Sequence, residues 1–153
     1  MALERWRCLL PAIWLGALLC LAAIATPAPF AVLDRAEAGQ VVAPMLLREA
    51  WLSLIFALLL LFAERRRTRD LAGAGSGSVL STDLMLLLGT LFCTVFGYFG
   101  LQPLMPAAKA GHAALSFGQL HALSAAAYAV KLLLVAALAW RAVGAPISRP
   151  PSS

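Results

Sequence analysis

Long apolar stretches dominate this chain, and most polar residues lie between them. A helix needs about 20 residues to cross the hydrocarbon core of a bilayer. Four apolar stretches reach or approach this length: residues 9–30, 41–63, 84–101 and 119–140. Their length predicts membrane-spanning helices. The second stretch is the weakest, because its uninterrupted apolar part covers only residues 50–63 and a full span must include Pro44, Arg48 and Glu49.

Four spans predict an all-α fold, an integral membrane four-helix bundle that forms one domain over residues 1–142. Asp34 and Glu37 have the spacing of a helix-capping pair. They predict a short helix along the membrane interface, from Arg35 to about Val42. Two segments are expected outside the bundle: a loop over residues 64–82, first basic and then rich in Gly and Ser, and a disordered tail over residues 143–153.

The basic residues are unevenly divided between the two sides of the spans. Of the 12 Lys and Arg residues, eight lie on the side of the termini and the 64–82 loop, three lie on the other side, and Lys131 lies inside the fourth span. Because cytoplasmic loops carry an excess of Lys and Arg, both termini and this loop are predicted to be cytoplasmic. The apolar run after Arg7 is too long for a secretory signal, so an uncleaved first span is expected. Cleavage near Ala28, which would leave three spans, is the alternative.

Composition excludes an ordinary soluble domain. Hydrophobic residues make up 62% of the chain and charged residues only 12%, against roughly 45–50% and about 25% in soluble domains. The net charge of +5 comes from Arg residues at the ends of the spans, so it indicates membrane topology and predicts no nucleic-acid partner. Three cysteines without a Cys-x-x-Cys motif, and only two histidines, predict no disulfide framework, no metal site and no cofactor.

The fourth span carries a polar face. His121, Ser124, Tyr128 and Lys131 follow one another at spacings of three, four and three, which places them on one side of a helix. Lys131 precedes Trp140 by nine residues, so it lies roughly 13 Å from the end of the span, near the middle of the hydrocarbon layer. A lysine at that depth costs about 2.5–3.5 kcal/mol on insertion scales, and something is expected to offset that cost.

Two interpretations of Lys131 remain open. In the functional one, Lys131 binds an anionic solute or handles protons, with Tyr128 and Ser124 as hydrogen-bonding neighbours. In the structural one, its long side chain extends to the headgroups or meets a structural partner. Glu49 is the natural partner, although the helical rise places it roughly 9 Å from Lys131 in depth.

His121 is expected at a depth similar to that of Arg48 and Glu49. A histidine beside a carboxylate at that depth could titrate near neutral pH. The alternative is an interfacial histidine that hydrogen-bonds a loop carbonyl.

Small residues mark two helix faces that can pack closely. Gly89, Cys93 and Gly97 recur every four residues in the third span, and Gly16 and Cys20 form a similar pair in the first. This spacing lets helix backbones approach each other in a membrane. It predicts packing, either within the chain or between copies in a homo-oligomer.

Four short motifs carry a resemblance to a known family: Trp14-Leu-Gly16, Thr26-Pro-Ala-Pro-Phe30, Gly97-Tyr98 and Phe117-Gly-Gln-Leu-His121-Ala-Leu-Ser124. With them, the chain from about Leu9 to Arg141 resembles the bacterial membrane family catalogued as domain of unknown function 4149, and it is similar to the eukaryotic transmembrane-protein-205-like family. The resemblance implies a four-helix protein of the bacterial inner membrane. The bacterial members have no assigned reaction, and the eukaryotic relatives are linked to drug resistance and trafficking.

The resemblance carries over His121 and Ser124 as the first candidate positions, followed by Trp14 and Phe117. Tyr128 departs from the family, because relatives frequently carry Asn there. The resemblance therefore implies a shared polar site at His121 and Ser124, and it does not by itself extend that site to Tyr128.

We expect a non-enzymatic, multi-pass inner-membrane protein that handles a small solute or ion through the face from His121 to Lys131. No nucleophile with a base, and no pair of carboxylates, falls at a matched depth, which argues against an intramembrane enzyme. The alternative is an accessory or assembly subunit that docks a larger membrane partner through its small-residue faces. The lipid bilayer is a partner under both hypotheses.

Overall fold

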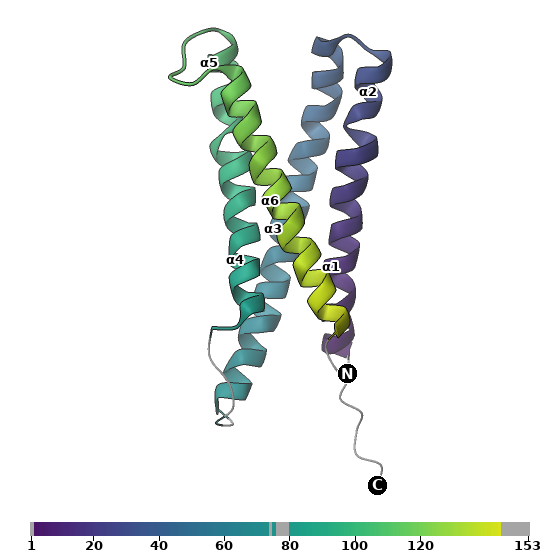
Figure 1. The fold of residues 1–153 in the computed structure, drawn as a ribbon, viewed down its shortest axis with the longest axis vertical. Helices are drawn as coiled ribbons and strands as arrows, with labels where there is room; N and C mark the ends of the chain where they lie inside the picture. Colours follow the sequence, from purple (N-terminus) through teal and green to yellow (C-terminus); the bar gives the residue numbers. More distant parts are fainter. Residues whose placement is uncertain (1, 74, 76–79, 145–153) are drawn as a thin grey trace.

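The computed structural model describes residues 2–73, 75 and 80–144, and these residues form helices and no strand. Long helices run up and down the molecule (Figure 1). In chain order the elements are α1 (Ala2–Cys20), the π-helical segment η1 (Leu21–Ala25), α2 (Pro27–Val32), α3 (Arg35–Gly73), α4 (Thr82–Thr94), the π-helical segment η2 (Val95–Gly100), the 3₁₀ turn η3 (Gln102–Leu104), α5 (Met105–Lys109) and α6 (Phe117–Gly144).

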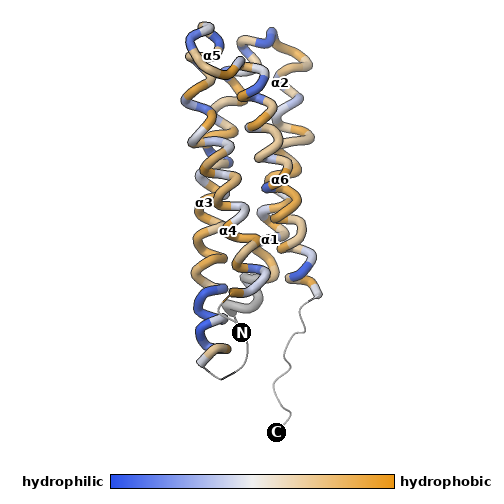
Figure 2. The backbone as a smooth tube through the Cα atoms, turned by 60° about the vertical axis from the view of Figure 1, so that its left-hand side comes forward, coloured by the Kyte–Doolittle hydropathy of each residue, from blue (hydrophilic) through white to orange (hydrophobic). Residues whose placement is uncertain are grey.

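Four helical stretches of the described chain are long and apolar enough to cross a membrane: Cys8–Val32, Arg35–Gly73, Thr82–Lys109 and Phe117–Gly144. At most 33% of the most apolar part of each stretch is buried within the molecule, so large apolar side chains point outward. Figure 2 shows hydrophobic residues along the bundle and hydrophilic residues gathered toward its two ends. An apolar exterior with polar ends is typical of a multi-pass membrane protein. The predicted all-α fold with four spans is confirmed.

Helix α3 extends beyond the predicted span at both ends. Residues 35–42, expected as a separate interfacial helix, form the first turns of α3, which continues through Pro44. Proline removes one backbone hydrogen bond from a helix interior, and neighbouring groups compensate for such a loss in membrane helices. Residues 64–73, expected as part of a loop, form the last turns of the same helix.

Side-chain contacts explain why the basic segment at the end of α3 is helical. The guanidinium of Arg67 lies 3.6 Å from the carboxylate of Glu64, one turn earlier. The guanidinium of Arg66 lies 4.6 Å from the ring centre of Phe62. Contacts between residues three or four positions apart stabilise helices.

The remaining segments of the predicted loop and tail are only partly described. Residues 74 and 76–79 of the loop lie outside the described residues, as do residues 145–153 of the tail. Residues 143 and 144, also expected in the tail, belong to α6.

The four spans form two hairpins. In the first, α1 and α2 pack against α3, and in the second, α4 and η2 pack against α6. α1 and α4 begin, and α3 and α6 end, at the same end of the bundle, which we call the terminal end (Figure 1). We call the opposite end, where α2 is followed by α3 and α5 is followed by α6, the loop end.

A shared core joins the two hairpins toward the terminal end. Its buried residues come from all four spans: Trp14, Leu18, Ala57, Leu60, Leu87, Val135 and Leu138. Toward the loop end, a smaller cluster of Leu101, Met105 and Leu120 lies within the second hairpin alone. The two hairpins diverge there (Figure 1). The candidate site lies where the shared core ends.

Candidate functional site

A buried ion pair links the two hairpins at mid-span. The ammonium nitrogen of Lys131 on α6 donates to Oε1 of Glu49 on α3 at 2.7 Å. Only 4% of the Lys131 side chain and 9% of the Glu49 side chain are exposed. Lys131 lies about 21 Å from the first residue of α6 and about 20 Å from the last, counted at 1.5 Å per residue. The charge expected to need a partner therefore has one within the chain.

Ser53 and Trp14 extend this pair into a network over three helices. The hydroxyl of Ser53, one turn after Glu49 on α3, donates to Oε1 of Glu49. The indole Nε1 of Trp14 on α1 donates to Oγ of Ser53 at 3.0 Å. The ammonium of Lys131 lies 3.4 Å from the same Oγ. Trp14 and Ser53 are fully buried, so α1 closes the network on the side of the shared core.

The depth difference expected between Lys131 and Glu49 does not keep them apart. α6 crosses the bundle obliquely (Figure 1). The depth of its residues therefore differs from an estimate that assumes helices parallel to the bundle axis. Side chains on a helix also point toward its N-terminus, which for α6 is the loop end. The Lys131 side chain therefore extends toward the level of Glu49.

Tyr128 and Ser124 complete the polar face of α6. The Tyr128 hydroxyl donates to the backbone carbonyl of Leu18 at 2.9 Å, and its ring centre lies 4.7 Å from the Lys131 ammonium. The Ser124 hydroxyl donates to the carbonyl of Gly97 at 2.9 Å. Gly97 lies within η2, and Leu18 lies shortly before η1. Side-chain donors from a neighbouring helix commonly satisfy carbonyls at such local changes of helical register in membranes.

The structure does not bring His121 and Arg48 to the pair. His121 is exposed, and its ring stacks on Phe117 with 6.0 Å between ring centres. Arg48 is also exposed, and within the described residues neither side chain contacts Glu49. Both lie on outward-facing sides of their helices. The spacing of residues in the sequence does not show which side of a helix faces outward.

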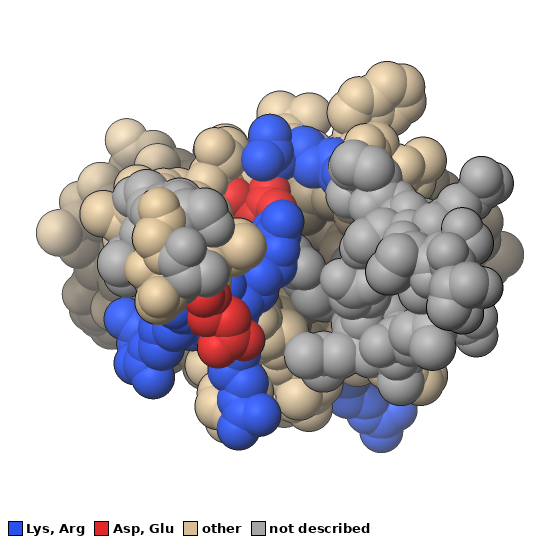
Figure 3. All heavy atoms as spheres, turned by 90° about the horizontal axis from the view of Figure 1, so that it is seen from below, with Lys and Arg blue, Asp and Glu red and all other residues tan. Residues whose placement is uncertain are grey.

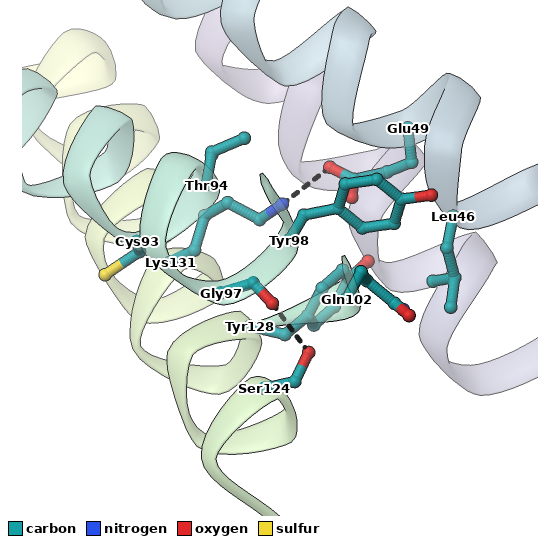
Figure 4. Close-up of a pocket in the computed structure, with 10 residues that line it drawn as sticks. All are labelled: Leu46, Glu49, Cys93, Thr94, Gly97, Tyr98, Gln102, Ser124, Tyr128 and Lys131. Atoms are coloured by element: carbon teal, nitrogen blue, oxygen red, sulfur yellow. Dashed lines mark hydrogen bonds and ion pairs between the residues drawn. The ribbon is translucent and has the colours of Figure 1, made fainter. Parts of the chain in front are cut away.

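A cavity of about 40 Å³ borders the pair. Figure 4 shows Lys131 and Glu49 pointing toward each other among the residues that line it. Leu46, Glu49, Cys93, Thr94, Gly97, Tyr98, Gln102, Ser124, Tyr128 and Lys131 line it. At about 10–15 Å³ per water, this volume holds roughly three water molecules. Because Leu46, Gln102 and Ser124 lie one to two turns closer to the loop end than the pair, the cavity extends in that direction.

Three polar groups around this cavity have no hydrogen-bond partner among the described residues. Both hydrogen bonds to Glu49 end on Oε1, which leaves Oε2 without one. The Tyr98 hydroxyl and the Gln102 side-chain amide also make none. The sequence patterns pointed to neither Ser53 nor Gln102, and Tyr98 entered only through the Gly97-Tyr98 motif of the family resemblance. Ser53 could have been found, because it lies four positions after Glu49 on the same face of α3.

The predicted small-residue faces have different surroundings. A Cβ atom built at Gly97 would lie 2.7 Å from the Cβ of Ala127, and one built at Gly89 would lie 3.0 Å from Cδ1 of Leu134. Both glycines therefore face α6 within the chain, and Cys93 between them lines the cavity. Gly16 and Cys20 are exposed, and a Cβ atom at Gly16 would meet nothing within 4 Å.

The site offers hydrogen-bond donors and acceptors to a small ligand. Lys131 supplies ammonium donors, and Oε2 of Glu49 can accept a hydrogen bond from cavity water. No group of three or more His, Cys, Asp or Glu residues that could hold a metal ion occurs in the described part of the chain.

Comparisons with known proteins connect these spans to one family. A family model described as Domain of unknown function (DUF4149) matches residues 9–114, which include the first three spans with Trp14, Glu49 and Ser53. No curated protein and no solved structure matched the chain. Since the matched residues make up well over half of its length, the chain belongs to the DUF4149 family.

Proposed function

We propose that this protein handles a small solute or ion through the pocket beside the Lys131–Glu49 pair, as a multi-pass protein of the bacterial inner membrane. One observation carries the proposal: a buried ion pair at mid-span borders a cavity. Charged residues within membrane spans are costly and usually belong to solute, ion or proton pathways.

A purely structural role accounts less well for this arrangement. Replacing a buried ion pair with apolar residues of similar size is often neutral or stabilising, so such a pair is a weak device for stability alone. A pair that served only packing would be enclosed by apolar side chains. Here Oε2 of Glu49, the Tyr98 hydroxyl and the Gln102 amide border the cavity without a hydrogen-bond partner in the described chain.

Charge distribution supports an orientation with the terminal end in the cytoplasm. The described basic residues at that end are Arg65, Arg66, Arg67, Arg69 and Arg141, and Figure 3 shows Lys and Arg side chains gathered there. Arg35 and Lys109 lie at the loop end. By the positive-inside rule, the cavity then extends toward the periplasmic side.

Reconstitution into liposomes tests the proposal. Wild-type protein should raise the flux of at least one small solute or ion above the leak of protein-free liposomes, in a panel of halides, protons and small neutral solutes. The double variant Lys131→Met with Glu49→Gln removes both charges and leaves no charge unpaired, and it should return the flux to the leak. His121→Ala, outside the cavity, is the matched control and should keep the wild-type flux. Wild-type flux at the leak level for every solute would refute the proposal.

The alternative, an accessory subunit that docks a larger membrane protein, has less support. Its two small-residue faces were those of the first and third spans. Gly89 and Gly97 already contact α6, so only the exposed face with Gly16 and Cys20 on α1 is free for a partner. Gly16→Leu should release a partner that docks there, as measured by co-purification.

A further inference from the structure

We propose that the ligand of this pocket is a small monovalent anion that binds together with one proton, the proton on Glu49 and the anion on Lys131. This inference rests on the function proposed above and names its substrate class. In the structure the two residues hold each other. In the ligand-bound state, each would hold one component of the acid.

Charge balance is the first argument. The empty site contains one positive and one negative side chain, both at most 9% exposed, so its net charge is zero. A proton alone would leave Lys131 unpaired at mid-span, and an anion alone would leave the site with a net negative charge. Unpaired charge at this depth is strongly disfavoured. A proton and a monovalent anion together keep the net charge at zero, so each makes binding of the other more favourable.

The position of the free carboxylate oxygen is the second argument. Oε1 of Glu49 accepts from both Lys131 and Ser53, whereas Oε2 accepts no hydrogen bond from the described residues. Water in the cavity can therefore relay a proton from the aqueous phase to Oε2 and leave the bonds to Oε1 in place. The Lys131 ammonium is then released from its counter-charge, although Ser53 and the Tyr128 ring still hold its position.

The remaining titratable groups around the pair do not compete for that proton. Cys93 from α4, Tyr98 from η2 and Tyr128 from α6 line the same cavity. These residue types are ordinarily neutral at neutral pH, whereas a carboxylate is ionised. α1 contributes Trp14, which does not titrate. Glu49 is thus the one negative group among the described side chains that line the cavity.

Three polar groups in the lining suit an anion once Glu49 is neutral. Tyr98 contributes a hydroxyl, Gln102 an amide and Lys131 its ammonium, and all three can donate. The first two have no other hydrogen-bond partner among the described residues, so they are free to turn toward a ligand. A volume of about 40 Å³, or roughly three waters, is large enough for a halide. A small cation is disfavoured, because Lys131 already occupies the position beside the carboxylate.

Proton uptake during chloride binding tests the inference on purified protein in detergent. Sodium chloride is titrated into a weakly buffered solution with a pH indicator, and sodium gluconate, which supplies no halide, serves as the ionic-strength control. In the pH range where wild type takes up about one proton per chloride bound, its chloride affinity should fall about tenfold for each unit of rising pH. Glu49→Gln should bind chloride with no proton uptake and no pH dependence. Arg48→Gln, at the exposed neighbouring position, should match wild type.

The outcomes separate this inference from the proposed function. Chloride binding to wild type without proton uptake would overturn the coupling and leave solute handling intact. No chloride binding to either wild type or Glu49→Gln would overturn the anion assignment, while the liposome panel of other solutes would still decide the proposed function. If Glu49→Gln does not fold, proton uptake and the pH dependence of the wild-type protein decide the inference by themselves.

Discussion

The ammonium of Lys131 lies 2.7 Å from a carboxylate oxygen of Glu49, although 82 positions separate the two residues in the chain. This contact joins the second hairpin to the first at mid-span. Its two charges depend on each other: with either one removed, the other would be buried without a counter-charge. The fold is therefore expected to tolerate the loss of both charges better than the loss of one.

Removing one charge should be more destabilising than removing both. Lys131→Met alone and Glu49→Gln alone should each lower the free energy of unfolding by about 3–5 kcal/mol, because each leaves an uncompensated buried charge. The double variant should be near wild type, or more stable by about 1–4 kcal/mol. Reversible unfolding in mixed micelles with increasing dodecyl sulfate measures all three.

A surface pair gives the matched comparison. Arg141 lies 2.5 Å from Asp83 near the terminal end, with 47% and 24% of the two side chains exposed. Arg141→Gln should cost only about 0–1 kcal/mol. Additive losses in the Lys131 and Glu49 double variant would contradict mutual compensation between the two buried charges.

The Tyr128 hydroxyl should stabilise the bundle through its hydrogen bond to the Leu18 carbonyl. Tyr128→Phe removes the hydroxyl and keeps the ring over Lys131, so a loss of about 0.6–1.7 kcal/mol is expected, as for hydrogen bonds between membrane helices. Tyr98→Phe is the control, because the Tyr98 hydroxyl has no hydrogen-bond partner within the described chain. The same unfolding measurement applies, and an equal loss in both variants would show that the Leu18 contact contributes nothing.

The parts of this architecture that depend on periodicity within one helix could be predicted from the sequence. Ser124, Tyr128 and Lys131 share a face of α6 because their spacing follows the helical repeat. The pairing of Lys131 with Glu49 was also predicted, because Glu49 is a carboxylate that lies within a predicted span. The residues that connect helices could not be predicted in the same way. Trp14 donates to Ser53 because α1 and α3 are in contact at that depth. A single sequence does not show at which depth two helices contact each other.

The predictions that differed from the structure have a common physical cause. The 9 Å depth estimate assumed straight, parallel helices, whereas α6 crosses obliquely (Figure 1). The end of α3 was expected to be a loop because residues 64–73 are too polar for a span, but polarity ends a span and does not end a helix. The Glu64–Arg67 pair supports the helix beyond that point.

Three glycines should respond differently to a single added methyl group. Gly97→Ala should destabilise the protein by about 1–3 kcal/mol, because the new Cβ would lie 2.7 Å from the Cβ of Ala127. Gly89→Ala should cost less, since the flexible tip of Leu134 can move away. Gly16→Ala meets nothing within 4 Å and should be neutral or slightly stabilising. Thermal unfolding in detergent ranks the three variants.

Rescue distinguishes close packing from other effects at Gly97. Ala127→Gly removes the atom that the new methyl group would meet, so Gly97→Ala with Ala127→Gly should recover most of the stability lost by Gly97→Ala. A double variant that unfolds as easily as Gly97→Ala would show that the cost arises from the backbone of η2 and not from contact with α6.

Selective labelling should place the terminal end in the cytoplasm. In a background with Cys8, Cys20 and Cys93 replaced by Ala, Arg69→Cys reports the terminal end and Lys109→Cys reports the loop end. Because the positive-inside rule puts the basic end of α3 in the cytoplasm, a membrane-impermeant maleimide should label Lys109→Cys in intact spheroplasts. Arg69→Cys should react only after the membrane is permeabilised. The reverse pattern would place the cavity on the cytoplasmic side, and the proton and anion proposed to enter it would then come from the cytoplasm.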